Sequence, residues 1–287
     1  MNTMLPVVPI AGALPARAGI GFKAGHFDDV LEAHAPPAFI EVHAENYMGD
    51  GGRPHAQLHA LRTRMPLSVH GVGLSLGGID PPAARHLARL GTLLDRYEPA
   101  SFSEHLAWST HGGRYFNDLL PLRYDDDTLL RTCSHIAQVQ DTLGRRLLLE
   151  NPSRYLEWSG GAKSEPEFIT GIVRRTGCGL LLDLNNVHVS CPNLGGNATA
   201  YLAALPLHAV GEIHLAGHAQ DGTLLIDTHG APVDDAVWAL YRAVIKRIGP
   251  QLTRIEWDTD PPAFDVLMGE TGQANQLLDV AITKLAA

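Results

Sequence analysis

The sequence has little cysteine, little positive charge and no long apolar run. Three cysteines in 287 residues exclude a small disulfide-rich scaffold. Lys and Arg number 22 against 31 Asp and Glu, which gives a formal charge of −9. Binding to nucleic acid needs clustered positive charge to neutralise phosphates, so this balance argues against DNA or RNA as a partner. No run of about 18 apolar residues exists, so we expect no membrane-spanning helix.

The cysteines and the N-terminal segment indicate a cytoplasmic protein. Cys133, Cys178 and Cys191 follow no metal-ligand spacing, and this odd, sparse set favours buried free thiols in a reducing compartment. A Cys178–Cys191 bridge is the alternative. Residues 1–19 are mildly apolar, but no basic segment precedes residues 5–14, and prolines at 6, 9 and 15 interrupt them. We interpret residues 1–18 as an N-terminal arm and not as a signal peptide.

Histidine, in contrast, is abundant, with 15 residues in the chain. Apolar residues make up 45% and charged residues 18%, which is ordinary for a globular protein with a sizeable core. Because histidine is the commonest metal ligand and carries protons near neutral pH, its excess is the first indication of function.

Short apolar or β-branched runs alternate with longer helical patterns along the whole chain. The strand-like runs lie at 18–22, 38–42, 67–70, 101–105, 147–150, 179–183, 210–214 and 253–256. The helical patterns include 81–97, 126–143, 165–176 and 234–248. Eight strand–helix units predict an α/β fold, a single (β/α)8 TIM barrel over residues 19–287. A doubly wound open sheet is the alternative, although GIGFKA at 19–24 matches its phosphate turn only loosely.

Several predicted helices have start signals. Asp80, Ser164 and Asp260 each stand just ahead of prolines, an arrangement that predicts an N-cap followed by proline in the first turn. The acidic run at 125–127 is expected to cap the helix over 126–143 and to complement its dipole.

Histidines and carboxylates end the predicted strands. This strand-end set comprises His70, His105, Glu150, Asp183, His214 and Glu256. In a barrel the C-terminal ends of all strands surround one mouth, so these side chains should converge there. Gathered in one cavity without cations, they would repel one another or lose solvation. Mixed His and carboxylate ligands suit Zn, Mn or Fe better than Ca or Mg, and their number indicates two or three ions.

A second cluster follows the seventh strand. Asp227 and His229 stand two residues apart and share a face if the backbone is extended, which favours a role as metal ligands. After Asp183, the pair Asn185 and Asn186 offers two open interpretations. One of these amides orients a ligand or binds metal weakly, or both cap a turn.

This order of residues resembles the xylose isomerase/endonuclease IV-like superfamily of TIM barrels with three metal ions. The resemblance assigns to the first site His70, His105 and Glu150, to the second Glu150, Asp183, His214 and Glu256, and to the third Asp227 and His229. Asn186 stands where the nuclease pattern has a histidine, and we include it among the candidate metal ligands.

The sequence is more closely similar to the multinuclear non-heme iron-dependent oxidases, a family that includes a methanobactin-biosynthesis oxidase. The motifs that carry this resemblance are GIGF at 19–22, EVHAENY at 41–47, VHGVGLSLG at 69–77, SEHLAWS at 103–109, LENPSRY at 149–155, DLNNV at 183–187, EIHLAGH at 212–218, DTHG at 227–230 and IEWD at 255–258. The resemblance covers roughly residues 19–279, almost the whole chain. His188 departs from the pattern, where an aromatic residue such as Tyr is expected.

The resemblance implies a specific chemistry. Family members use two or three iron ions, in mixed Fe(II) and Fe(III) states, and O2 to modify cysteine residues of a ribosomally made precursor peptide. Many act with a small partner protein that binds the leader segment of that peptide. A thiolate is a strong ligand for iron, which suits such a site. Asp258 and His218, near the mouth, are candidates to move protons, or to support a ligand.

Two other enzymes on the same barrel are alternatives, a divalent-metal sugar isomerase or epimerase and an endonuclease IV-like hydrolase. The hydrolase needs a basic groove, whereas the pairs Arg145–Arg146 and Arg174–Arg175 lie before strands, toward the far end of the barrel. A metal-storing or peptide-binding barrel without catalysis is a further alternative, and O2 consumption would separate it from an oxidase.

Overall fold

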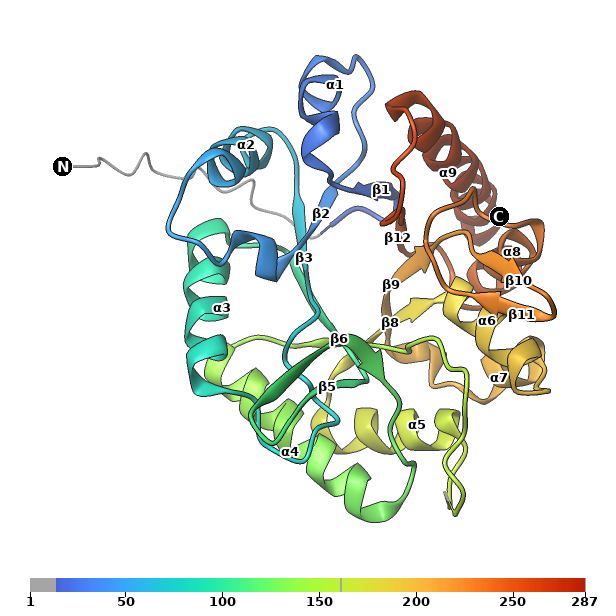
Figure 1. The fold of residues 1–287 in the computed structure, drawn as a ribbon. Coiled ribbons are helices and arrows are strands. Elements are labelled where there is room, and N and C mark those ends of the chain that lie inside the picture. Colours follow the sequence, from blue (N-terminus) through green and yellow to red (C-terminus); the bar gives the residue numbers. More distant parts are fainter. Residues whose placement is uncertain (1–13, 161, 287) are drawn as a thin grey trace.

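A closed barrel of parallel strands forms the centre of the computed structural model, which describes residues 14–160 and 162–286 (Figure 1). Around the barrel the strands follow the order β1-β12-β9-β8-β7-β4-β3-β2. Their bounds are β1 (Ala18–Gly21), β2 (Ile40–His43), β3 (Leu67–Gly71), β4 (Ser101–His105), β7 (Leu148–Glu150), β8 (Gly179–Asp183), β9 (Val210–Leu215) and β12 (Leu252–Ile255). The predicted TIM barrel is confirmed, and the open-sheet alternative is excluded because β1 pairs with both β2 and β12.

The predicted strands agree with the observed ones to within two residues at each end. The largest shift is in the second strand, which begins at Ile40 instead of residue 38 and ends at His43. These short runs are readable because both faces of a barrel strand are covered, so β3 and β8 are buried at every position.

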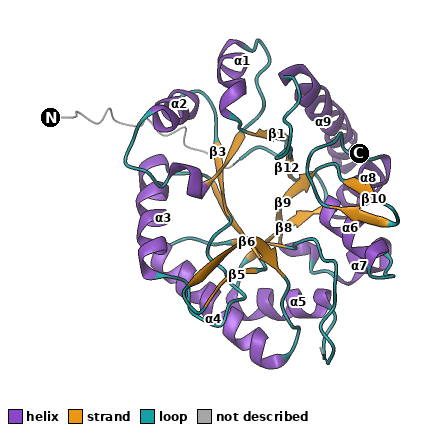
Figure 2. Ribbon diagram, in the orientation of Figure 1, coloured by secondary structure: helices purple, strands orange, loops and turns teal. Residues whose placement is uncertain are grey.

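Helices surround the barrel on its outer side (Figure 2). Their bounds are α1 (Phe27–Glu32), α2 (Arg53–Arg62), α3 (Ala84–Tyr97), α4 (Asp126–Leu143), α5 (Glu165–Thr176), α6 (Leu184–Asn193), α7 (Ala198–Ala204), α8 (Asp235–Ile248) and α9 (Phe264–Ala286), with short 3-10 turns η1 (Ala24–His26), η2 (Ala44–Tyr47) and η3 (Leu207–Ala209). The apolar core lies between this layer and the strands, as Leu90 of α3, Phe102 of β4 and Ile136 of α4 illustrate. None of the helices in the described part of the chain is both long and apolar enough to cross a membrane.

Two of the predicted helix caps are confirmed and two are wrong. Ser164 forms a reciprocal capping box with Glu167, and the Asp125 side chain accepts a hydrogen bond from the Thr128 backbone N–H. Asp80 does not cap α3, which starts only at Ala84, and Asp260 lies well ahead of α9 with a φ of 47°. Both are followed by two prolines, and a residue before proline is disfavoured in the helical region, so the helix starts later.

Two hairpins that the sequence patterns did not predict interrupt the alternation. β5 (Trp108–His111) and β6 (Arg114–Leu120) follow β4, and β10 (Ala219–Asp221) and β11 (Leu224–Ile226) follow β9. Both insertions follow C-terminal strand ends, so they lie at the mouth, and Figure 1 shows β5 and β6 in front of the barrel opening. These strands are short and mix polar with apolar residues, so they give no strong strand periodicity.

The N-terminal arm predicted for residues 1–18 lies outside the described residues up to position 13. Of the described remainder, Arg17 pairs with Asp279 of α9, and Ala18 already begins β1. Within the described chain Cys133, Cys178 and Cys191 are buried free thiols, so the alternative Cys178–Cys191 bridge is wrong.

Candidate metal centre

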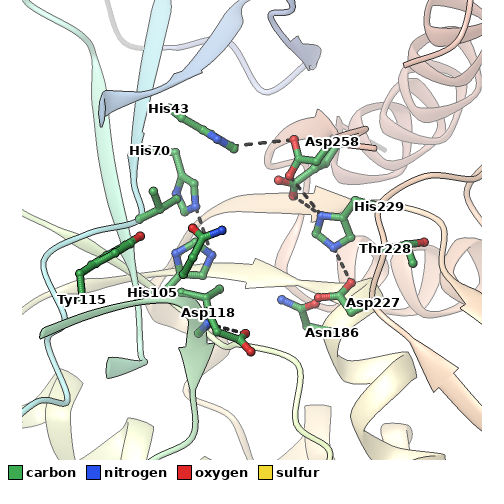
Figure 3. Close-up of a pocket in the computed structure, with 14 residues that line it drawn as sticks. His43, His70, His105, Tyr115, Asp118, Asn186, Asp227, Thr228, His229 and Asp258 are labelled. Carbon is green, nitrogen blue, oxygen red and sulfur yellow. Dashed lines mark hydrogen bonds and ion pairs between the residues drawn. The ribbon is translucent and has the colours of Figure 1, made fainter. Parts of the chain in front are cut away.

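The ends of neighbouring strands bring the predicted ligands together. In the barrel register His105 of β4 lies beside Glu150 of β7, and Asp183 of β8 lies beside His214 of β9. His70 of β3 is paired one step away, with Ser103. Parallel pairing at matched depth therefore places these side chains in one layer at the mouth, and Figure 3 shows His70 and His105 pointing toward each other there.

The first group of ligands consists of His70, His105 and Glu150. The two imidazole Nε2 atoms lie 3.3 Å apart, and Glu150 Oε2 lies 3.2 Å from His70 Nε2 and 3.4 Å from His105 Nε2. Three donor atoms thus face one point, a geometry in which a cation can replace the contacts among them.

The outer nitrogens of both imidazoles are held by other groups. His70 Nδ1 lies 2.7 Å from Ser103 Oγ, and His105 Nδ1 lies 3.3 Å from the carbonyl oxygen of Gly71. When Nδ1 donates its proton outward, the Nε2 lone pair is free to face a metal.

The second group consists of Glu150, Asp183, His214 and Glu256, each with one ligand atom within 4.8 Å of the others. His214 Nδ1 lies 2.9 Å from Glu256 Oε2. Asp183 also caps α6, because its Oδ1 accepts the backbone N–H of Asn186 at 2.6 Å. Glu150 belongs to both groups, so the two candidate sites share one carboxylate.

Several buried atoms at this junction form no hydrogen bond of good geometry in the described residues, although imidazole–carboxylate contacts join some of them. They are Glu150 Oε2, Asp183 Oδ2, Asn186 Oδ1, His214 Nδ1, His229 Nε2 and Glu256 Oε2. A buried acceptor without a donor costs about 1–3 kcal/mol, more when it is charged, so their concentration here needs a physical reason. A cation ligated by these atoms satisfies them, and the residues present therefore fit metal ions.

Asp227 and His229 lie beside the second group. His229 Nε2 is 2.6 Å from Asp227 Oδ1, and its Nδ1 is 3.5 Å from Glu256 Oε2. The Asp227 carboxylate accepts a hydrogen bond from Asn185 Nδ2 at 2.8 Å, and its backbone N–H donates to Tyr155 Oη at 2.8 Å. Figure 3 shows Asn186 facing this pair.

The two asparagines have different contacts. Asn185 holds Asp227, whereas Asn186 donates from Nδ2 to the carbonyl of Asn151 at 3.0 Å and to Glu150 Oε1 at 3.5 Å. Asn186 lines the cavity, and its Oδ1 has no hydrogen-bond partner among the described residues, so this oxygen is available as a ligand. Both residues lie in the first turn of α6.

The cavity at the mouth has a volume of about 320 Å³. Its walls include, besides ligands from both groups, His43 of β2, Asp258 after β12, and Tyr115, Asn117, Asp118 and Leu119 of β6. The second candidate proton carrier, His218, is not among the cavity-lining residues. Its ring packs on His188 with a centroid distance of 4.9 Å.

Asp258 sits at the edge of this cavity among cationic groups. Its Oδ1 is 2.6 Å from Lys23 Nζ, and its Oδ2 is 3.7 Å from His229 Nδ1. Burial and Glu256 act to raise the pKa of Asp258, but His229 and Arg254 outweigh them and lower it to about 2. The group is therefore ionised at neutral pH and is a weak proton acceptor, which suits the support of a neighbouring ligand better than proton transfer.

Below the ligands lies a polar cluster that the strand-end analysis did not identify. His214 Nε2 is 3.3 Å from Glu41 Oε1, and Arg254 Nη1 pairs with Glu41 and with Glu256 Oε1, at 3.1 Å from the latter. Burial opposes ionisation of Glu41, but Arg254 and His214 hold its pKa well below the usual range. Glu41 thus orients His214 from behind, as outer carboxylates do for ligating histidines.

His43 is a second residue that the ligand assignment left out. It lies at the C-terminal end of β2, in the EVHAENY motif, which is the same kind of position as His70. One ligand atom of His43 lies within 4.8 Å of atoms of Glu256 and Asp258. Its position at a strand end is the signal that could have identified it.

Burial and neighbouring charges shift the pKa values of the two histidines of the first group in opposite directions. Burial, assisted by His105, holds the pKa of His70 well below its ordinary value. Burial also acts to lower the pKa of His105, but Glu150 and Glu104 outweigh it and raise the pKa to about 9. Burial raises the pKa of Asp183 well above the usual range. The metal-free centre therefore holds protons that bound cations would displace.

Comparison with known proteins gives one family over nearly the whole chain. A family model described as "RiPP precursor modification enzyme MbnB/TglH/ChrH" matches residues 17–279, where RiPP denotes a ribosomally synthesised and post-translationally modified peptide. A UPF0276 protein of Bordetella parapertussis is 55% identical over 268 residues, which cover 92% of this chain and 93% of that protein. A UPF0276 protein of Caulobacter vibrioides is 52% identical over 264 residues, 91% of this chain and 94% of the relative.

Solved structures with the same fold include enzymes of other chemistry. A D-tagatose 3-epimerase-like protein matches 94% of this chain and 99% of its own with a TM-score of 0.60 and 13% identity. Endonuclease IV from Thermus thermophilus matches 93% of this chain and 99% of its own with a TM-score of 0.56 and 15% identity. At this identity the similarity supports the barrel fold alone.

Proposed function

The chain belongs to the MbnB/TglH/ChrH family of RiPP precursor modification enzymes, and from this membership we propose that it is an iron- and O2-dependent oxidase. Its substrate in this proposal is a cysteine residue of a ribosomally made precursor peptide. The cofactor is a set of two or three iron ions in mixed Fe(II) and Fe(III) states. A small leader-binding protein acts as its partner.

The observation that carries this proposal is the sharing of Glu150 between two ligand groups. Glu150 Oε2 lies within 3.4 Å of both imidazoles of the first group, and one carboxylate oxygen of Glu150 lies within 4.8 Å of ligand atoms of the second. A carboxylate with two oxygens can bind two adjacent cations, and a mixed set of imidazoles and carboxylates suits iron. The first ion would be held by His70, His105 and Glu150, and the second by Glu150, Asp183, His214 and Glu256.

A third ion would be held by Asp227 and His229, with Asn186 Oδ1 directed to the same space. Asn185 and Tyr155 fix Asp227 from behind, through its carboxylate and its backbone N–H respectively. Because Asn186 is neutral, this third position carries less negative charge than a fully acidic one and is the weakest of the three.

When bound, the iron ions supply a ligation site for the substrate thiolate and the electrons that O2 requires. The chain's own residues bind the ions and orient the ligands. Ser103 and the Gly71 carbonyl fix the imidazoles of the first group, and Glu41 fixes His214. Asp258 Oδ2, 3.7 Å from His229 Nδ1, supports this candidate ligand at the mouth, and the ring of His218 packs on that of His188.

The size of the cavity supports a peptide substrate with a separate leader-binding partner. About 320 Å³ lies at the small end of the range for ligand pockets, roughly 300–1,000 Å³. A short segment around one side chain fits there, whereas a leader must bind elsewhere. In this proposal residues 19–287 form the catalytic barrel, residues 1–18 form an arm, and buried free thiols suit a cytoplasmic location.

Metal analysis and Mössbauer spectroscopy test the proposal. The protein is expressed in iron-supplemented medium and purified without oxygen, and we expect two to three irons per chain with a coupled Fe(II)/Fe(III) signal. Reduced protein with a cysteine-containing peptide should then consume O2, and the same peptide with Ser in place of Cys should not. Stoichiometric zinc or manganese without retained iron would contradict the proposal and favour a hydrolase or an isomerase.

A further inference from the structure

The hairpin in front of the mouth contains an irregular ladder. Trp108 of β5 lies opposite Leu120 of β6, and Thr110 lies opposite Tyr115. Ser109 alone therefore faces the four residues 116–119, which have no partner positions on β5 in this register. We call residues 116–119 the β6 bulge. Bulges of this kind are common next to active sites, where they redirect side chains and interrupt pairing.

The β6 bulge faces the metal centre. Asn117, Asp118 and Leu119 line the same cavity as His70 and His105, together with the preceding Tyr115. Figure 3 shows Tyr115 and Asp118 on the side of the cavity opposite Asp258 and His229. A substrate side chain that reaches the ligands must therefore pass this segment of β6.

The side chains around the bulge differ in their contacts and in their exposure to solvent. Phe116 packs on Trp108 with a centroid distance of 5.9 Å, whereas Tyr115 is 59% exposed. Asp118 is exposed, and its Oδ1 accepts the backbone N–H of Leu119 at 2.8 Å. In the described part of the chain no ion pair includes Asp118. The hairpin thus places two features at the cavity. One is a segment of β6 that is not paired with β5, and the other is a carboxylate without an ion-pair partner in the described chain.

We propose that the β6 bulge binds the substrate peptide as an extended segment and selects a basic residue next to the residue that is modified. This inference rests on the proposed function and names how its substrate is recognised. An extended peptide can form hydrogen bonds with backbone N–H and C=O groups of a strand segment that has no partner strand, as in other strand-addition complexes. The Asp118 carboxylate is complementary to Lys or Arg, and Tyr115 supplies an aromatic surface for the peptide.

Peptide selection tests the charge preference. A displayed library of eleven-residue peptides with a central Cys and five random residues on each side is selected anaerobically on iron-loaded protein. The wild-type protein should enrich Lys or Arg beside the Cys about threefold to fivefold, the size expected for one exposed ion pair. The Asp118→Lys variant should enrich Asp or Glu instead. Asp141→Lys, at an exposed position near the end of α4, is the matched control and should behave as wild type.

A second measurement tests the extended pairing. The most enriched peptide is labelled, and its affinity is measured by fluorescence anisotropy after N-methylation of each residue in turn. Strand pairing directs alternate N–H groups to the bulge, so alternate positions should lose affinity by about tenfold, the loss expected from one hydrogen bond. Equal losses at all positions, or none, would overturn the pairing.

The outcomes separate this inference from the proposed function. Charge reversal and alternation, together with no O2 consumption when the Cys-containing peptide is added, would support the docking and contradict the cysteine chemistry. O2 consumption that depends on the Cys, with an unchanged charge preference in Asp118→Lys, would overturn the docking and leave the oxidase intact. A library in which the wild-type protein enriches no peptide also overturns the docking.

Discussion

Carboxylates are buried at two places in the barrel, and their hydrogen-bond and ion-pair partners differ between the two. In the wall, Glu165 is 3% exposed and faces Arg154 Nε at 3.0 Å and the Tyr124 hydroxyl at 3.1 Å. At the mouth, Glu150 and Asp183 are at most 1% exposed and keep carboxylate oxygens without a hydrogen-bond donor among the described residues. Burial raises the pKa of Glu165 and of Glu150 alike, so desolvation does not distinguish the two places.

The difference lies in where the compensating cation comes from. In the wall the compensating cation is the guanidinium of Arg154, which pairs with Glu165. This pairing holds the loop after β7 in place. At the mouth the carboxylates face imidazoles that share protons with them, and the carboxylate oxygens without a donor are atoms that a bound cation would satisfy. A buried acid next to the chain's own cation is thus structural, whereas one with an orphaned oxygen indicates a ligand.

The largest effect is expected from Glu150→Gln, which removes the carboxylate common to both ligand groups. Outer partners of metal ligands typically account for about tenfold to hundredfold in affinity, and loss of a shared ligand should exceed hundredfold. We expect the metal content after equilibrium dialysis to fall by two ions per chain. Activity should be lost together with them.

The matched control for this change is Glu165→Gln in the wall, which should keep the full metal content. The melting temperature of metal-free Glu150→Gln should be at least that of the metal-free wild type, because a buried charge has been removed. A variant that keeps two ions per chain would contradict the shared role of Glu150.

Arg154→Met should be the most destabilising change outside the mouth. It leaves Glu165 buried without its cation, and breaking a buried pair in this way costs about 3–5 kcal/mol. Urea unfolding of the metal-free protein measures the loss. In the double variant Arg154→Met/Glu165→Gln most of the stability should return, and a double variant as unstable as the single one would show that the pairing is not the cause.

Ser103→Ala removes the partner of His70 Nδ1 without touching a ligand. We expect about tenfold weaker binding of one ion, within the range for outer partners, and little change in unfolding free energy. A competition titration with a chelator measures the affinity. The control is Ser109→Ala, a buried serine whose hydroxyl has no hydrogen-bond partner in the described chain. Equal effects of the two changes would refute the orienting role of Ser103.

The smallest expected effect is a loss of stability at Asp125, whose carboxylate accepts a backbone hydrogen bond at the start of α4. The hydrogen bond from the Thr128 backbone N–H lowers its pKa. Asp125→Ala should therefore cost about 1 kcal/mol of unfolding free energy at neutral pH. Because the folded pKa is depressed, this contribution is present above the unfolded pKa and is lost as the pH falls through the folded one. Unfolding curves that show the same difference at pH 7 and pH 2.5 would refute this origin.

Most of the ligand set was predictable because strand ends are local features. His70, His105 and Glu150 each end a short buried run, and the barrel architecture brings such ends together whatever the intervening sequence. Asp227 and His229 were recognisable from their spacing. In the structure His70, His105, Asp227 and His229 line one cavity, and Glu150 lies beside the first two.

Other features depend on contacts that no local pattern contains. Glu41 and Arg254 are 213 residues apart, and their pairing appears only when the first and last strands close the barrel. The β5–β6 hairpin mixes polar residues with apolar ones, most of β6 is exposed, and its apolar residues do not alternate regularly, so no strand pattern indicates it. The late start of α3 reflects the two prolines after Asp80, whose combined effect on the chain outweighs the capping preference.

The closure between β1 and β12 also determines when the metal centre can assemble during protein synthesis. Chains leave the ribosome at about 5–20 residues per second, so Glu150 emerges well before Glu256, which follows the last strand. Until β12 is available to join β1 and β9, the sheet is open and the second ligand group lacks a member. Complete loading of the proposed metal centre would therefore be an event of the finished chain. In that case the metal ions must reach the folded protein and not the nascent polypeptide.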